Sequence, residues 1–238
     1  MISHFLHAAW NNLVMANYVV PEKLLSPYIP DKTELDFYEG KTYVSLVGFM
    51  FLNTRIRGFS VPYHVNFEEV NLRFYVKHND RGKWKRGVVF IKEIVPKPAI
   101  SFIANNLYRE KYSTMKMKHF HIEKDDLIET CYKWKYKDKW NELTATCHKK
   151  SLPMRINSEE EFFAEHSWGY TKYNDTKTYE YEVRHPRWEI FQVSDYVIDC
   201  DFKGIYGNEF SFLNRTKPSS VFMAKGSEVR IHSKTSLS

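Results

Sequence analysis

The sequence predicts a mainly β (α+β) fold, a barrel-like antiparallel or mixed sheet with a few helices. Two observations predict it: short β-rich runs recur along the 238 residues, and Gly, Asn, Asp and Pro separate them. A hydrophobic fraction of 43% and an aromatic fraction of 16% give enough apolar surface to offset the entropy lost on folding. Because no repeat, low-complexity tract or long linker interrupts the pattern, we expect one domain over residues 1–238.

The expected elements follow from local patterns. Strands are predicted over 42–52, 69–76, 87–94, 132–140, 179–183 and 211–213, and helices over 21–28 and 98–108. A third helix is predicted to begin at Ser158, because Glu161 three residues later completes a capping box, and to end near Gly169.

Composition and charge narrow the classes of function that this chain can have. The formal charge of +6 is spread along the chain, which disfavours a nucleic-acid partner. Residues 1–20 lack a basic start and carry three asparagines, so they suit neither a signal peptide nor a membrane span, and we expect a cytoplasmic protein without membrane contact. The three cysteines are widely spaced with no C-x-x-C pair, which favours reduced core thiols over a disulfide framework or zinc site.

The most informative stretch is 67–76. Strand alternation places its apolar residues on one face, and on the other face it places Glu69, Asn71, Arg73 and Tyr75. If the second face lines a cavity, Glu69 and Arg73 could bind and polarise a small carbonyl or carboxylate compound. If it faces water, they are ordinary surface residues.

Two further segments have both functional and structural interpretations. Residues 108–118 gather lysines and hydroxyls; a buried lysine there could form a Schiff base, although clustered lysines are usually solvated. In 133–139, lysines alternate with aromatic residues, which suits phosphate binding, but the two sets point to opposite strand faces, which favours a solvated strand with buried aromatics.

Histidines give weaker signals. His119 and His121 share a strand face as metal-binding pairs can, but no third ligand has a convincing spacing, so we expect no metal. His185 and Trp188 bracket Pro186, which favours extended geometry and presents an imidazole and an indole together; the segment equally suits a structural strand end. No nucleophile elbow, P-loop or dinucleotide fingerprint is present, and we expect no cofactor.

Several segments, taken in order, resemble the YqjF-like family, a group of uncharacterised proteins in the acetoacetate decarboxylase-like superfamily. The resemblance spans nearly the whole chain and is carried by Trp10, 21–30, 67–76, 87–90, 108–117, 181–188 and 226–231. It implies a barrel-like β architecture with an internal small-molecule cavity. Fold likeness alone does not transfer function.

The superfamily resemblance also bears on site residues. Acetoacetate decarboxylases carry the Schiff-base lysine in a Pro-Lys-Lys motif, and the best match here is Lys111-Tyr112-Ser113. Tyr112 and Ser113 then occupy the two lysine positions, and neither side chain can form an iminium. The superfamily's strand glutamate matches Glu69. The resemblance thus implies an acidic cavity without Schiff-base acetoacetate decarboxylase activity.

We therefore expect a small carbonyl- or carboxylate-bearing metabolite to bind in the barrel cavity, with Arg73, His185 and Trp188 as ligand-binding residues. Alternatively the protein is an acid/base enzyme, with Glu69 as acid or base and Tyr112 as hydrogen-bond donor to a developing oxyanion. A third alternative is a nucleic-acid or other surface-interaction protein that uses the lysines of 133–139. Exposed strand edges would also allow a homodimer.

Overall fold

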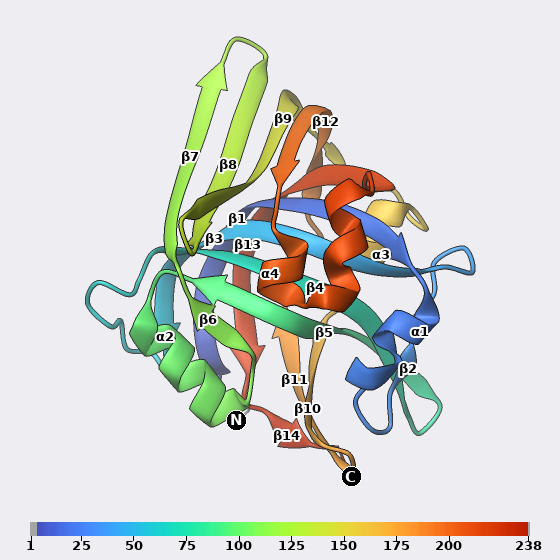
Figure 1. Ribbon diagram of the computed structural model, residues 1–238. Helices are drawn as coiled ribbons and strands as arrows, with labels where there is room; N and C mark the ends of the chain where they lie inside the picture. Colours follow the sequence, from blue (N-terminus) through green and yellow to red (C-terminus); the bar gives the residue numbers. More distant parts are fainter. Residues whose placement is uncertain (1–3, 238) are drawn as a thin grey trace.

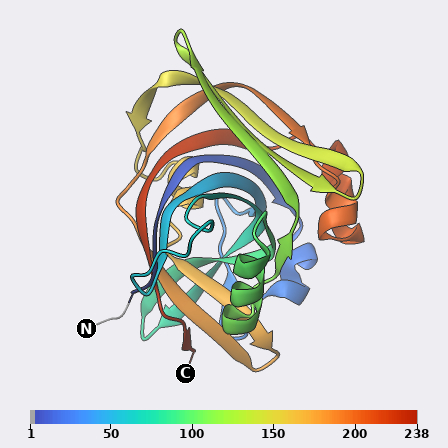
Figure 2. The same cartoon turned by 90° about the vertical axis from the view of Figure 1, so that its left-hand side faces the viewer.

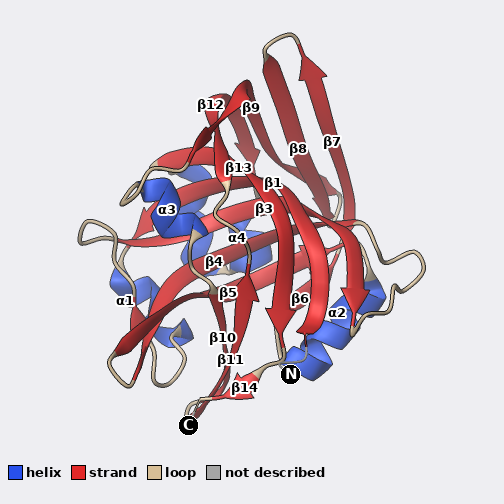
Figure 3. Cartoon of the chain, turned by 180° about the vertical axis from the view of Figure 1, so that it is seen from behind, coloured by secondary structure: helices blue, strands red, loops and turns tan. Residues whose placement is uncertain are grey.

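The computed structural model describes residues 4–237, and their side chains apart from those of residues 4, 107 and 108. The strands are β1 (His4–Val20), β2 (Glu34–Leu35), β3 (Thr42–Ile56), β4 (Phe67–Asp80), β5 (Lys83–Val95), β6 (Tyr112–Thr114), β7 (Lys116–Lys124), β8 (Leu127–Tyr136), β9 (Lys139–Pro153), β10 (Trp168–Asn174), β11 (Lys177–Arg184), β12 (Glu189–Asp199), β13 (Ser220–His232) and β14 (Thr235–Ser236). The helices are α1 (Glu22–Leu25), α2 (Pro98–Ile103), α3 (Glu159–Ala164) and α4 (Phe202–Tyr206), with short turns η1 (Ser26–Tyr28), η2 (Ala104–Tyr108) and η3 (Asn208–Arg215). Figure 3 shows how few and short the helices are.

Seven strands of the described chain close into a ring in the order β5-β4-β3-β1-β13-β11-β10, with β10 returning to β5 (Figures 1 and 2). Neighbours in the ring are antiparallel except β10 and β5, which pair in parallel at two register positions, Trp168 with Gly87 and Gly169 with Val88. Closure hides the strand edges that an open sheet exposes. The barrel-like, mainly β fold predicted from the sequence is confirmed.

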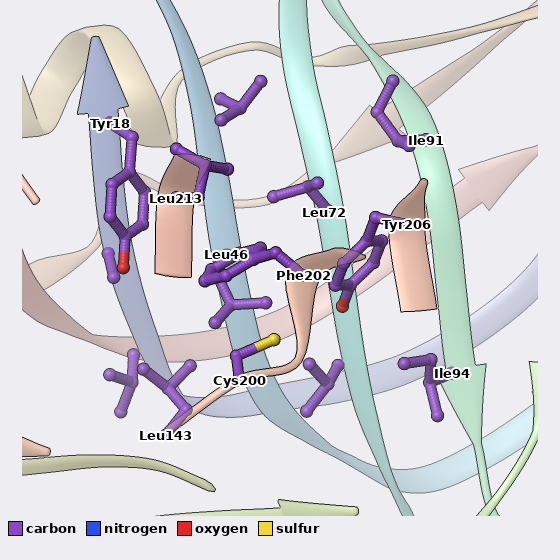
Figure 4. Packing of buried hydrophobic residues seen from close by; sticks show 14 of the residues in the cluster. Tyr18, Leu46, Leu72, Ile91, Ile94, Leu143, Cys200, Phe202, Tyr206 and Leu213 are labelled. Carbon is purple, nitrogen blue, oxygen red and sulfur yellow. The ribbon is translucent and has the colours of Figure 1, made fainter. Parts of the chain in front are cut away.

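The four strands β12, β9, β8 and β7 leave the ring at β13 and form an arm that curls over its outer surface (Figure 2). Between the arm and the ring lies an apolar core to which α4 and η3 also contribute. Figure 4 shows part of it, with Leu46 and Leu72 from the ring, Leu143 from the arm and Phe202 from α4. A second, aromatic-rich core fills part of the ring's interior. Strands β1, β3 and β4 are therefore covered on both faces.

At two positions in the ring, only glycine avoids a steric clash with the neighbouring strand. At Gly226 φ is +83°, and a Cβ there would lie 1.9 Å from the carbonyl oxygen of Trp10 on the neighbouring strand β1. At Gly87 a Cβ would lie 2.6 Å from the backbone oxygen of Trp168 at the parallel junction. A larger residue at either position would push two strands apart. The ring's closure thus depends on both.

Three elements predicted from the sequence differ from the structure. The predicted strand 132–140 is the hairpin of β8 and β9, which turns at Lys137 with φ of +52°. Residues 211–213 lie in η3, because a run as short as Ser211-Phe212-Leu213 suits a helical turn as well as a strand. The third helix ends at Ala164, and Gly169 belongs to β10, although the Ser158 cap is present, with its Oγ accepting from the Glu161 amide at 3.3 Å.

Buried polar contacts fix the segments around the ring. Asp36, which follows β2, accepts hydrogen bonds from His166 Nε2 at 3.0 Å and Arg86 Nε at 2.6 Å. Burial alone would raise the pKa of Asp36, but these two partners outweigh it and lower the pKa.

Cys131, Cys147 and Cys200 are buried and unbridged, as predicted. In residues 4–237 no helix is long and apolar enough to span a bilayer.

Candidate functional site

Two adjoining cavities lie within the ring, near the end at which α2 packs. The place of α2 beside the ring can be followed in Figure 2. The inner cavity, about 70 Å³, is bordered by Glu69, Asn71, Arg73, Tyr112, His185 and Trp188. The outer cavity, about 100 Å³, lies beneath α2 and is largely apolar. Each is far larger than the ~10–15 Å³ that one water molecule needs. The interior of the ring therefore has room for a small organic molecule.

Glu69 points from β4 into the inner cavity and is only 2% exposed. Its Oε2 accepts a hydrogen bond from the Tyr112 hydroxyl at 2.9 Å, and its Oε1 accepts one from Asn71 Nδ2 at 3.0 Å. Burial raises the pKa of Glu69 to about 7, against the opposing effect of those two hydrogen bonds. A carboxyl group with this pKa can both donate and accept a proton near neutrality.

Two more carboxyl groups lie close to Glu69. Glu93 of β5 is 2% exposed and pairs in register with Asn71 on one side and Tyr112 on the other. Burial, followed by the nearby charges of Glu110 and Glu69, raises the pKa of Glu93 well above its ordinary value. Glu110 accepts from Thr171 Oγ1 at 2.6 Å, and burial raises its pKa to about 7. Because three carboxylates cannot all ionise in so small a volume, the cluster retains protons at neutral pH.

Two phenols connect these carboxyl groups. Tyr112 lies within hydrogen-bonding reach of Glu69 and Glu93, so a protonated Glu93 can donate to Tyr112 while Tyr112 donates to Glu69. Tyr181 of β11 is hydrogen-bonded to Glu110. Burial raises the pKa of both phenols well above the ordinary value, so both keep their protons. The two phenols thus hold protons on the wall that the two cavities share, where Tyr112 contacts Glu69 and Tyr181 contacts Glu110.

The local structure holds Tyr112 in this position. Asn105 of η2 clamps its backbone, donating from Nδ2 to the Tyr112 carbonyl at 3.0 Å and accepting from the Tyr112 amide at 2.8 Å. Thr114 donates to Ser101 Oγ at 2.9 Å, which ties β6 to α2. The segment that carries the phenol is thereby fixed to the helix that roofs the outer cavity.

Arg73 supplies a positive charge beside the inner cavity. Its Nη2 donates to the Phe163 carbonyl at 3.0 Å, whereas its buried Nε has no hydrogen-bond partner among the described residues. Asn71 Oδ1 and Glu93 Oε2 are likewise buried and without a partner in that part of the chain. Such atoms are costly to bury unpaired, by about 1–3 kcal/mol each, and their gathering at one cavity gives it free hydrogen-bonding capacity.

His185 and Trp188 close one side of the inner cavity. Their rings stack with centroids 4.0 Å apart and planes at 16°, and Trp188 Nε1 donates to Ser227 Oγ at 2.8 Å. Burial lowers the pKa of His185, which favours the neutral imidazole. All five residues selected from the sequence, Glu69, Arg73, Tyr112, His185 and Trp188, border this one cavity. Their roles remain predictions.

The lysines singled out in the sequence lie elsewhere. Lys111 is exposed, with Nζ 5.0 Å from the centre of the Tyr28 ring, while its neighbour Tyr112 points inward. No lysine among the residues whose side chains are described lines either cavity. On the β8–β9 hairpin, Lys133 pairs with Glu142 at 2.9 Å and Lys139 with Asp199 at 2.7 Å. Because both charges are matched locally, the hairpin is a poor phosphate-binding strand.

The two histidines singled out in the sequence each have another partner. His119 Nδ1 lies 2.7 Å from Glu68 Oε1, and His121 Nδ1 lies 2.8 Å from Thr130 Oγ1. Within the described residues, no group of three or more His, Cys, Asp or Glu side chains is arranged to hold a metal ion.

Sequence reasoning missed Glu93, Glu110 and Tyr181. For Glu93 a signal exists: it is a charged residue within the apolar run 87–95 of a strand now seen to be mostly buried. Glu110 follows a helical turn and has no distinctive pattern around it. Tyr181 lies in a strand with one other tyrosine and two glutamates, and the packing of Gly169 against its ring distinguishes it only in the structure.

The fold of this chain is similar to that of acetoacetate decarboxylase-like enzymes. The enduracididine biosynthesis enzyme MppR in complex with pyruvate matches 98% of this chain and 90% of its own, with a TM-score of 0.70 at 12% identity. Acetoacetate decarboxylase from Legionella pneumophila subsp. pneumophila str. Philadelphia 1 matches 98% and 87%, with a TM-score of 0.65 at 13% identity. An acetoacetate decarboxylase-like enzyme from Sphingomonas wittichii RW1 matches 98% and 92%, with a TM-score of 0.67 at 10% identity.

The chain belongs to the DUF2071 family, described as an uncharacterised conserved protein (COG2071), whose model matches residues 7–228. It is also 35% identical over 86 residues to the uncharacterised protein YqjF of Bacillus subtilis (strain 168). That match covers 36% of this chain and 34% of YqjF, about a third of the relative's length. The resemblance seen in the sequence is therefore confirmed.

Proposed function

We propose that this protein binds a small carbonyl- or carboxylate-bearing metabolite in the inner cavity. The observation that carries the proposal is the set of buried, unpartnered polar atoms on Asn71, Arg73 and Glu93 around that cavity. Arg73 Nε can donate to a carboxylate or carbonyl oxygen, and a protonated Glu93 can do the same. The structure of MppR, which holds pyruvate in a similar fold, is consistent with a ligand of this size.

We further propose that binding does not proceed through a Schiff base. The inward position that follows Lys111 is occupied by Tyr112, and a phenol cannot condense with a ketone to give an iminium. The lysine nearest in sequence, Lys111, is exposed. Amine-dependent decarboxylation therefore lacks its nucleophile in this cavity.

If the bound compound is turned over, acid/base chemistry fits the site best. Glu69, with a pKa of about 7, would take a proton from carbon next to the ligand carbonyl or return one to it. Tyr112 would donate a hydrogen bond to the oxyanion that forms, and Arg73 would hold the carboxylate. All three groups border one cavity.

A thermal-shift screen against 2-oxo acids, ketones, small carboxylates and short oligonucleotides tests the proposal, with wild type, Arg73→Gln and Arg81→Gln compared. A ligand at one hundred times its Kd should stabilise wild type by about 2.7 kcal/mol, which is roughly 5 to 11 °C for a chain of this size. We expect Arg73→Gln to lose the shift with carboxylates. Arg81, an exposed residue in the β4–β5 turn, is the matched control and should keep it.

Two outcomes would contradict the proposal. In one, no small compound stabilises the wild type while an oligonucleotide does so in a salt-sensitive way. This result would favour nucleic-acid binding by the lysines of residues 133–139. In the other, the shift with carboxylates is equal in wild type and Arg73→Gln. A shift that is retained should then be followed by a search for conversion of the ligand, which separates an enzyme from a binding protein.

A further inference from the structure

The outer cavity differs in chemistry from the inner one. Its walls come from the ends of β1, β3 and β4 and from α2, and they present Leu6, Phe51, Ile56, Phe67, Ile100 and Ile103. On α2, Ile100 and Ile103 face the cavity, whereas Phe102 between them is 69% exposed. Apart from Glu93, Glu110, Tyr112 and Tyr181, the walls of this cavity are aliphatic and aromatic, and such walls favour apolar molecules over water.

The two cavities meet along one wall. Phe51, Glu93, Tyr112, Tyr181 and Ile231 line both of them. The polar members of that wall, Glu93 and the two phenols, lie where the apolar space ends and the polar space begins. Arg73, Asn71 and Glu69 border only the inner cavity. Together the cavities are polar at one end and apolar at the other.

We propose that the ligand of this site is amphipathic: a carbonyl or carboxylate head occupies the inner cavity, and a short apolar chain extends past Tyr112 into the outer cavity beneath α2. This inference rests on the proposed function and names the class of compound that the site takes. A polar head alone would leave the walls under α2 without contacts, whereas a chain of a few carbons buries apolar surface on both partners. Compounds as small as pyruvate are then weak ligands here.

The test is isothermal titration with straight-chain 2-oxo acids from pyruvate to 2-oxooctanoate. Each added methylene that enters the outer cavity should lower Kd by about fourfold, until the cavity is full and the gain stops. Ala104 of η2 also lines the outer cavity, and Ala104→Phe should fill it. We expect this variant to bind pyruvate like wild type and to lose the gain with chain length. Phe102→Ala, on the exposed side of α2, is the control and should behave like wild type.

The outcomes separate this inference from the proposed function. If pyruvate binds but Kd stays flat along the series in wild type, the inference is overturned and the head-group site stands. If no 2-oxo acid binds at all, the inference is overturned, and the proposed function is then decided by the ketones and other carboxylates of the thermal-shift screen. If Ala104→Phe does not fold, Ile103→Ala replaces it, and it should weaken binding of the long acids while leaving pyruvate unchanged. Equal chain-length gains in wild type and in the folded outer-cavity variant would also overturn the inference.

Discussion

Replacing Glu69 by glutamine should change how folding stability depends on pH. In the folded protein the pKa of Glu69 is raised from 4.5 to about 7, so the carboxyl keeps its proton over a pH range in which the unfolded chain has released it. The folded state therefore binds more protons between these values, and the free energy of unfolding falls as pH rises through them. The full change is about 3 kcal/mol, at about 1.36 kcal/mol for each unit of pKa.

Glutamine removes this titration and keeps the shape of the side chain. We expect urea denaturation to show that the stability of Glu69→Gln relative to wild type rises by about 2.5 kcal/mol between about pH 5 and about pH 8. The comparison with wild type cancels groups that titrate in both proteins. Glu129→Gln, the same change at an exposed position of β8, is the control and should show no such rise.

The reasoning would be refuted by a stability difference between Glu69→Gln and wild type that is the same at both pH values. That result would mean that Glu69 is ionised in the folded state throughout the range, so that Arg73 and the hydrogen bonds from Asn71 and Tyr112 outweigh its burial. Glu69 would then act as a fixed negative charge and could not serve as a proton donor.

Three further predictions concern other residues. Asp36→Asn should destabilise the protein by about 1 to 3 kcal/mol in urea at neutral pH, because it weakens the hydrogen bonds that buried Asp36 accepts from His166 and Arg86. Since these partners lower the pKa of Asp36, the effect should shrink as pH falls. Gly169→Ala should weaken ligand binding in a titration, because the new Cβ would lie 2.2 Å from Tyr181 Cζ and must displace that phenol; unchanged affinity would remove Tyr181 from the site. Borohydride reduction in the presence of a bound 2-oxo acid should give no covalent adduct by mass spectrometry, and an adduct on Lys111 would contradict the absence of a Schiff base.

Much of the fold could be predicted from the sequence, because strand alternation and turn residues are local signals. The stretch 67–76 is the clearest case: Val70, Leu72 and Phe74 face the core beneath the arm, and Glu69 and Arg73 face the inner cavity. What the pattern could not decide was whether the second face was wet, because an exposed polar face and a polar cavity wall look alike in one strand.

The remainder of the site depends on pairings between distant strands. Glu93 lies beside Asn71 because β5 pairs with β4, and beside Tyr112 because β6 joins β5 in parallel. Tyr181 reaches the same wall only because β10 and β11 complete the ring. No property of residues 93, 112 or 181 taken singly encodes these registers. The turn at Lys137 was missed for a different reason, since a lysine with positive φ lacks the usual glycine or asparagine signal.

The position of β1 between β3 and β13 has a consequence for how the chain is made. β1 pairs with β3 soon after both are synthesised, but its other edge pairs with β13, whose partners run from Ser220 opposite Asn17 to His232 opposite His4. That edge has no strand to pair with until almost the whole described chain has left the ribosome. Contacts so far apart in sequence form slowly, and an unpaired edge is open to association with other chains in the meantime. Newly made copies of this protein are thus most vulnerable to aggregation just before synthesis of β13 is complete, and shielding of the β1 edge by a chaperone would act at that stage.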